Sequence, residues 1–256
     1  MLKITLLILS FLITPLFNEE NNLKILNFNI QGFKTKKIEK KIKLIVNKIK
    51  EYDMFFIQEN WVYNQLFKDN LFDFNLIFNN KKKSTIHGSG LTIGFNNDFK
   101  ILDSDEVLFS QCNGLIFNGL DCFASKGFIF SRVLYNGDII DTYTTHLDAG
   151  TSKKDKNVRL EQLNEFKNYI YKKSENIPLI ICGDFNINYS LDSLIINDFI
   201  SFLDLKFSNN KLDNAIDYIF YRNSNDVNFQ TINIRDDYFN ELSDHKPIMI
   251  ELKINK

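Results

Sequence analysis

Short apolar runs and one clear helical repeat alternate along the first part of the chain. Leu23–Ile30 alternates apolar and polar side chains, which predicts a strand with one buried face. Isoleucines then recur at helical spacing from Ile38 to Ile49 among lysines, and this spacing predicts an amphipathic helix. Asp53–Ile57 is a second apolar run of strand length. A strand, helix, strand order favours parallel strands, whose carboxyl ends would meet at one edge of a sheet.

Strands predominate in the rest of the chain. They are predicted at 74–78, 90–95, 100–109, 127–135, 139–145, 178–182, 216–221, 227–234 and 248–252. Asn136-Gly137 lies between two of them and is a hairpin turn signal. A helix is also predicted at 191–202. One further helix would align four positions on roughly one face, namely Leu160, Leu163, Lys167 and Ile170.

Polar residues capable of chemistry stand where many of these strands end or begin. They are Asn29, Glu59, His146, Asp184 with Asn186, Asp217, and Asp244 with His245. A lone histidine is more often structural than catalytic, and a lone glutamate is usually solvated. Here two of the 3 histidines stand at strand edges close to an aspartate, and the order of the motifs is regular. Open α/β sheets build sites at this edge, so the ordered set predicts one catalytic site.

The N-terminus differs in composition from the rest. Lys3 precedes an apolar run from Ile4 to Phe17, which is shorter than the roughly 20 residues that span a bilayer. The pattern predicts a secretory signal peptide at residues 1–21, and hence a secreted protein. An uncleaved membrane anchor and a buried strand are the alternatives. Residues 22–256 contain no evident linker or repeat and are read as one domain.

Composition and charge narrow the function classes. The 256 residues are 44% hydrophobic and carry a formal net charge of -1. A sizeable core is therefore available, and binding that depends mainly on a polyanion is disfavoured. A nuclease is not excluded, because a bound metal supplies local positive charge. Cys182 lies in an apolar strand, whereas Cys112 and Cys122 flank a turn-rich segment and either pair as a disulfide or remain free thiols.

The ordered motifs resemble those of the endonuclease/exonuclease/phosphatase superfamily, which contains deoxyribonuclease I, inositol polyphosphate phosphatases and neutral sphingomyelinases. The matching pieces are Asn27-Phe28-Asn29, Ile57-Gln58-Glu59, Thr145-His146-Leu147, Gly183-Asp184-Phe185-Asn186, Ile216-Asp217-Tyr218-Ile219 and Ser243-Asp244-His245-Lys246-Pro247. The resemblance implies a four-layer α/β sandwich, in which two mixed β-sheets pack face to face with helices outside.

One segment resembles neutral sphingomyelinases in particular. Gly119–Gly127, with Asp121, Cys122 and Lys126, is similar to their Asp-Cys-x-x-x-Lys-Gly block, and Thr145–Ala149 also looks like that group. Bacterial sphingomyelinases carry an aromatic-tipped membrane hairpin between the last motifs. The stretch Tyr189–Ala215 is too short and too helical for one, so we expect membrane engagement to be weaker or to use another loop.

The resemblance implies metal-assisted hydrolysis of a phosphate ester. Glu59 and Asn29 would hold a divalent metal, most simply Mg²⁺, and Asp244 would contribute to a second metal position or fix the His245 backbone. His245 would be the general base, oriented by Asp217. Asp184 and Asn186 would position the water and stabilise the pentavalent phosphorus. His146 would bind the phosphate or protonate the leaving group, and Asp121 and Lys126 would orient His146 and contact the substrate.

The expected substrate is a sphingomyelin-type phospholipid at a membrane surface, cleaved to ceramide and phosphocholine. A secreted nuclease of the deoxyribonuclease I type is the first alternative, although the net charge of -1 does not indicate a basic groove for nucleic acid. An inositol phosphate phosphatase is another. A binding protein that kept the fold and lost catalysis is the alternative from a different class, and the complete polar set argues against it. No protein partner can be inferred.

Overall fold

The structure is a computed structural model that describes residues 22–33, 38–79, 81, 88–113, 122, 124–208, 215–235 and 242–255. The predicted signal peptide at residues 1–21 and the candidate residue Asp121 lie outside the described residues. No helix in the described ranges is long and apolar enough to cross a membrane.

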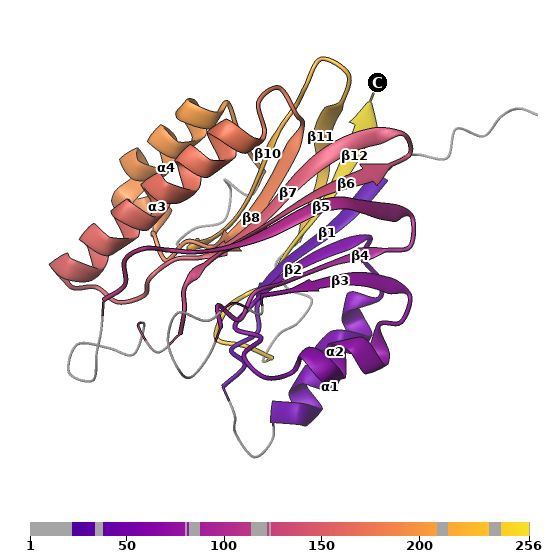
Figure 1. The fold of residues 1–256 in the computed structure, drawn as a ribbon, viewed down its shortest axis with the longest axis horizontal. Coiled ribbons are helices and arrows are strands. Elements are labelled where there is room, and N and C mark those ends of the chain that lie inside the picture. The colour runs from indigo at the N-terminus through magenta and orange to yellow at the C-terminus, as the bar shows by residue number, and fades with distance from the viewer. Residues whose placement is uncertain are drawn as a thin grey trace, which may run out of the picture.

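Two six-stranded sheets form the centre of the molecule (Figure 1). The first sheet has the order β11-β12-β1-β2-β4-β3. Its strands are β1 (Asn22–Asn29), β2 (Met54–Gln58), β3 (Phe74–Phe78), β4 (Thr92–Asn96), β11 (Asn228–Arg235) and β12 (Ile248–Asn255). The second sheet has the order β5-β6-β7-β8-β10-β9. Its strands are β5 (Phe99–Leu108), β6 (Gly127–Tyr135), β7 (Asp138–His146), β8 (Leu179–Asp184), β9 (Lys206–Phe207) and β10 (Asp217–Arg222).

Helices cover the outer face of each sheet (Figure 1). α1 (Ile38–Ile49) and α2 (Asn64–Asn70) pack on the first sheet, and α3 (Lys153–Lys173) and α4 (Tyr189–Leu203) pack on the second. Apolar side chains from both sheets, among them Ile25, Phe56 and Ile180, form the core between them. Each fully buried side chain of this size stabilises the fold by roughly 1.5–3 kcal/mol. The predicted four-layer sandwich is confirmed.

Parallel pairing brings the chemically active strand ends to one edge. β1 runs parallel to β2, and β7 runs parallel to β8. The carboxyl ends of β1 and β8 also meet across the sandwich, as the contact between Asn29 and Asp184 shows. The shared edge predicted for Asn29 and Glu59 is therefore confirmed, and this edge is called the catalytic edge below.

A buried polar network joins the two sheets beneath the catalytic edge. The side-chain amide of Asn27 donates to the backbone carbonyls of Gly183, at 3.3 Å, and Tyr218, at 3.4 Å. Gln58 donates to Asn27 Oδ1 at 2.9 Å and to Thr144 Oγ1 at 3.1 Å. Buried amides of this kind must be hydrogen-bonded to be tolerated. The network therefore favours a single register between the sheets, and it fixes the relative positions of the residues above it.

Local predictions differ from the structure in three places. The face of α3 that was predicted from Leu160, Leu163, Lys167 and Ile170 is only partly the buried one. Leu160 is 36% exposed, and Lys167 pairs with Asp198 at the surface. Gln162 takes the inner position and accepts from the Asp148 backbone N–H. The sequence reading also missed α2 and the two-residue strand β9. The Asn136-Gly137 hairpin is confirmed, with both residues in the left-handed region.

Candidate active site

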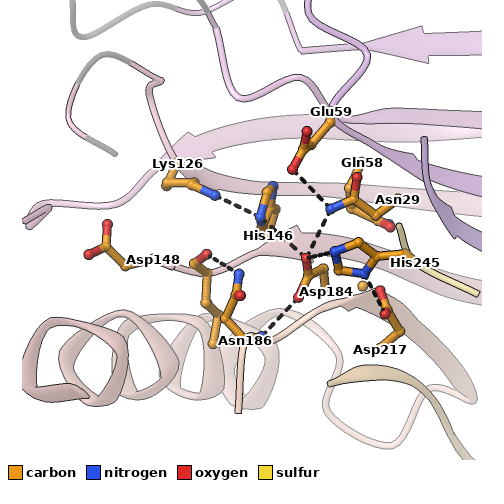
Figure 2. Close-up of polar contacts among 12 residues, drawn as sticks. Asn29, Gln58, Glu59, Lys126, His146, Asp148, Asp184, Asn186, Asp217 and His245 are labelled. Carbon is orange, nitrogen blue, oxygen red and sulfur yellow. Dashed lines mark hydrogen bonds and ion pairs between the residues drawn. The ribbon is translucent and has the colours of Figure 1, made fainter. Parts of the chain in front are cut away.

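Asn29 and Glu59 meet where β1 and β2 end (Figure 2). The Asn29 amide donates to Glu59 Oε1 at 3.1 Å and to Asp184 Oδ2 at 3.0 Å, so it bridges the two carboxylates. Glu59 has a left-handed backbone, with φ 62°, which is uncommon for a residue with a side chain and occurs often at functional sites. A Cβ at Gly32 would lie 2.0 Å from the Glu59 carbonyl oxygen, so Gly32 allows the close approach of these two segments.

The Gly183–Asn186 segment carries two polar groups on one side of the chain. Gly183 lies against β7, where an added Cβ would be 2.4 Å from the Thr145 carbonyl oxygen. Phe185 is fully buried beneath α3 and α4, which turns Asp184 and Asn186 toward the catalytic edge. The Asn186 backbone N–H donates to Asp184 Oδ1 at 2.9 Å, and its amide donates to the Leu147 carbonyl at 3.0 Å. The φ of 51° at Asn186 permits both contacts.

His245 stands between two carboxylates. Its Nδ1 lies 2.7 Å from Asp217 Oδ2, and its Nε2 lies 3.7 Å from Asp184 Oδ2 (Figure 2). Ser243 fixes this loop by donating to the Asn29 carbonyl oxygen at 2.7 Å. Burial lowers the pKa of His245, but the hydrogen bond and charge of Asp217, with further carboxylates, outweigh burial and raise it to about 10. The contact with Asp217 places the hydrogen on Nδ1 and leaves Nε2 facing the site.

His146 and Lys126 form a second, deeper pair. Lys126 Nζ lies 2.7 Å from His146 Nε2, and the two residues are only 5% and 3% exposed. Burial lowers the pKa of His146 well below its usual value, and the charge of Lys126 adds to this effect. The imidazole is therefore neutral, and the ammonium donates to Nε2. His146 Nε2 also lies 3.4 Å from Asp184 Oδ2, which connects this pair to the rest of the cluster.

A hard divalent cation fits the cluster. Glu59 Oε2 is buried and has no hydrogen-bond partner among the described residues. One ligand atom from each of Asp184, Asp217 and His245 lies within 4.8 Å of the others. Burial raises the pKa of Glu59 and Asp217, and burial together with the charge of Asp217 raises the pKa of Asp184 to about 6. Glu59 is linked to Asp184 through the Asn29 amide, and carboxylate oxygens of this kind are ligands typical of Mg²⁺.

The structure brings together seven of the predicted residues, namely Asn29, Glu59, His146, Asp184, Asp217, His245 and Lys126. Asn186 contacts the same Asp184. Asp244 is exposed and accepts from Gln31 Nε2 at 2.8 Å, so it lies at the rim of the cluster. Asn27 and Gln58 support the site; they were named from the sequence within the matching motifs but were assigned no role. Their position next to Asn29 and Glu59 in otherwise apolar strands was the available signal.

Comparison with known proteins identifies the family. A family model described as "Endonuclease/Exonuclease/phosphatase family" matches residues 26–245. The chain belongs to this family. Proteins similar to it in sequence include the sphingomyelinase of Mycobacterium tuberculosis, 26% identical over 60% of this chain and 35% of that protein. Another is sphingomyelinase C of Listeria ivanovii, 34% identical over 41% of this chain and 36% of that protein. The chain thus matches about a third of the length of these relatives.

Several solved structures share the fold. SmcL has a TM-score of 0.68 at 18% identity, over 91% of this chain and 99% of that one. Humanized TDP2 of D. rerio has a TM-score of 0.71 at 16% identity, also over 91% and 99%. A Staphylococcus aureus beta toxin variant, solved with bound magnesium ions, has a TM-score of 0.67 at 19% identity, over 90% and 99%. At these identities the likeness establishes the fold, and the family membership indicates a phosphoesterase-type hydrolase.

Proposed function

We propose that the protein is a Mg²⁺-dependent phosphodiesterase that hydrolyses a sphingomyelin-type phospholipid to ceramide and phosphocholine. The proposal depends on one observation. At the catalytic edge, His245 contacts both Asp217 and Asp184, and the Lys126–His146 pair belongs to the same cluster. The Lys126–His146 contact joins the segment that resembles the sphingomyelinase block to the catalytic cluster. The sphingomyelinase relatives support the same substrate class.

Glu59, with Asp184, would hold the metal ion, and Asn29, whose amide N–H groups donate to both carboxylates, would orient them rather than bind the ion itself. Such an ion supplies positive charge that polarises the phosphoryl group and lowers the pKa of His245 toward neutrality, where the free imidazole is populated. The Asn29 oxygen accepts from the Gln31 backbone N–H at 3.0 Å, which holds the amide in its present orientation. Glu59 Oε2, buried without a partner among the described residues, is the oxygen best placed to bind the ion.

His245 Nε2 would accept a proton from the attacking water, and Asp217 would stabilise the resulting imidazolium through Nδ1–H. The water oxygen then bonds to phosphorus as the bond from phosphorus to the ceramide oxygen breaks. The ceramide oxygen takes up a proton from solvent water, and His245 returns its proton to solvent. Asp184, whose Oδ2 lies 3.7 Å from His245 Nε2, would orient the water, and Asn186 would hold Asp184 in place through its backbone N–H. The Lys126 ammonium, which already donates to neutral His146, would neutralise charge on the phosphoryl and leaving oxygens. Secretion, through a signal peptide at residues 1–21, is part of the proposal.

The test is phosphocholine release from sphingomyelin in detergent micelles, compared with cleavage of duplex DNA, each with Mg²⁺ and with EDTA. Wild type should release phosphocholine only with Mg²⁺. Glu59→Ala and His245→Ala should each reduce turnover at least 10³-fold while remaining folded. Glu161→Ala, an exposed position on α3, is the matched control and should be fully active. DNA cleavage without phosphocholine release would instead establish a nuclease and overturn the lipid assignment.

A further inference from the structure

The start of α4 exposes two large apolar side chains. Leu191 is 79% exposed and Leu194 is 82% exposed. Among the exposed large hydrophobic residues of the described chain, only Phe72, at 79%, is comparable. The helix backbone is interrupted between the two leucines by a non-helical Asp192. The buried side of α4 is formed by Ile196, Phe199 and Leu203, so neither leucine is needed for the core.

These leucines lie at the catalytic edge. α3 follows the carboxyl end of β7 and α4 follows the carboxyl end of β8, and these two strands are parallel. Both helices therefore begin at the edge that carries the active site, and Figure 1 shows them side by side on the outer face of the second sheet. Lys156 of α3 lies 3.5 Å from Asp192 of α4, which joins the two helix starts directly.

Lysines occupy the first turn of the neighbouring helix α3. Lys153 and Lys154 in the first turn of α3 are exposed, as is Lys156. The neighbouring Asp155 points inward, where it accepts from the Ser152 backbone N–H and the Asn113 amide. Its carboxylate is thus engaged, and Asp192 already pairs with Lys156. The α3–α4 docking surface, defined as Leu191, Leu194, Lys153 and Lys154, is therefore both apolar and basic.

We propose that the α3–α4 docking surface binds an anionic phospholipid bilayer and holds the catalytic edge against it. Exposed leucines insert into the interfacial region of a bilayer, and adjacent lysines are attracted to anionic headgroups. This inference rests on the proposed function and names the surface by which the enzyme reaches its substrate. Phe33, 56% exposed, and Val62, 52% exposed, follow the carboxyl ends of β1 and β2 in the first sheet, so the bilayer would also meet apolar side chains from that sheet.

The test separates docking from catalysis by using vesicles that lack sphingomyelin. Binding of wild type to phosphatidylcholine vesicles, with and without phosphatidylserine, would be measured by sedimentation. The test variants are the double variant Leu191→Ser with Leu194→Ser and the double variant Lys153→Gln with Lys154→Gln. The matched control is Phe72→Ser, which has the same exposure but precedes β3 at the opposite edge. Turnover in detergent micelles, where no bilayer exists, reports the active site alone.

Wild type should bind the anionic vesicles more tightly than the neutral ones. The leucine variant should bind about 10- to 100-fold more weakly, and the lysine variant should lose the preference for anionic vesicles. Phe72→Ser should bind as tightly as wild type, and all variants should keep micelle turnover.

Three results would overturn the proposal: wild type does not bind the vesicles, the leucine variant binds as tightly as wild type, or Phe72→Ser loses as much binding as the leucine variant. A dimer in solution that only the leucine variant dissociates, with vesicle binding unchanged, would also overturn it and assign the surface to self-association. Vesicle binding without phosphocholine release in micelles would overturn the proposed substrate and leave the docking surface in place.

Discussion

Replacing Asp217 with Asn tests the central pair of the proposed mechanism. The carboxylate lies 2.7 Å from His245 Nδ1 and is the chief reason that the pKa of His245 rises to about 10. An asparagine keeps the shape of the side chain and removes the charge. Its amide N–H can also face Nδ1, which would move the imidazole hydrogen to Nε2 and prevent that atom from accepting a proton from water.

The size of the effect follows from the strength of a charge-assisted hydrogen bond, which is about 1.5–3 kcal/mol. This corresponds to a decrease of about 1–2 units in the pKa of His245. We expect kcat to fall by about 10²–10⁴-fold, as for loss of a group that orients a catalytic histidine. Asp198→Asn, an exposed carboxylate on α4, is the matched control and should leave kcat unchanged.

The assay has two readouts. NMR titration of His245 in EDTA should give a pKa near 10 in wild type and a lower value in the variant. Because the folded-state pKa is raised, the stabilising contribution of His245 is fully present below pH 6.5 and is lost as pH rises through about 10. The variant should therefore show a smaller loss of stability across that range. A kcat within threefold of wild type, together with an unchanged titration, would refute the role of Asp217.

Three further predictions concern the metal, the close approach of two strands, and the disulfide. Mg²⁺ at 100 times Kd should raise the unfolding free energy of wild type by about 2.7 kcal/mol, measured as a higher melting temperature. The melting temperature of Glu59→Gln should stay nearly unchanged, and equal shifts would contradict the ligand assignment. Gly183→Ala should lower the unfolding free energy by about 1–3 kcal/mol and lower kcat, because its Cβ would lie 2.4 Å from the Thr145 carbonyl oxygen. Denaturant unfolding and turnover measure both effects, and no change in either would mean that the two strands separate without cost. The double variant Cys112→Ser with Cys122→Ser removes the disulfide of the structure and should destabilise the fold by about 2–3 kcal/mol in urea unfolding. Unchanged stability would show that the bond does not restrict the unfolded chain.

The sequence by itself predicted most of the strands and helices, and the polar residues at their ends. Alternating and helical periodicities depend on residues close in sequence, so the strand at 23–30 and the helix at 38–49 could be predicted closely. The strand, helix, strand order limited the connection to a parallel one, which placed Asn29 and Glu59 together. The family resemblance added the order of the motifs and the four-layer architecture.

Tertiary structure alone decided which long-range partners meet. The sequence left Cys112 and Cys122 as either a disulfide or free thiols, and the fold joins them. Gln58 reads as an ordinary strand end, yet it links the two sheets by donating to Thr144 of β7. Leu160 has the right character for a core position, but the path of α3 over the sheet gives the inner place to Gln162. Such outcomes depend on packing between segments far apart in the chain, where a buried polar group is stable only if a distant partner completes its hydrogen bonds.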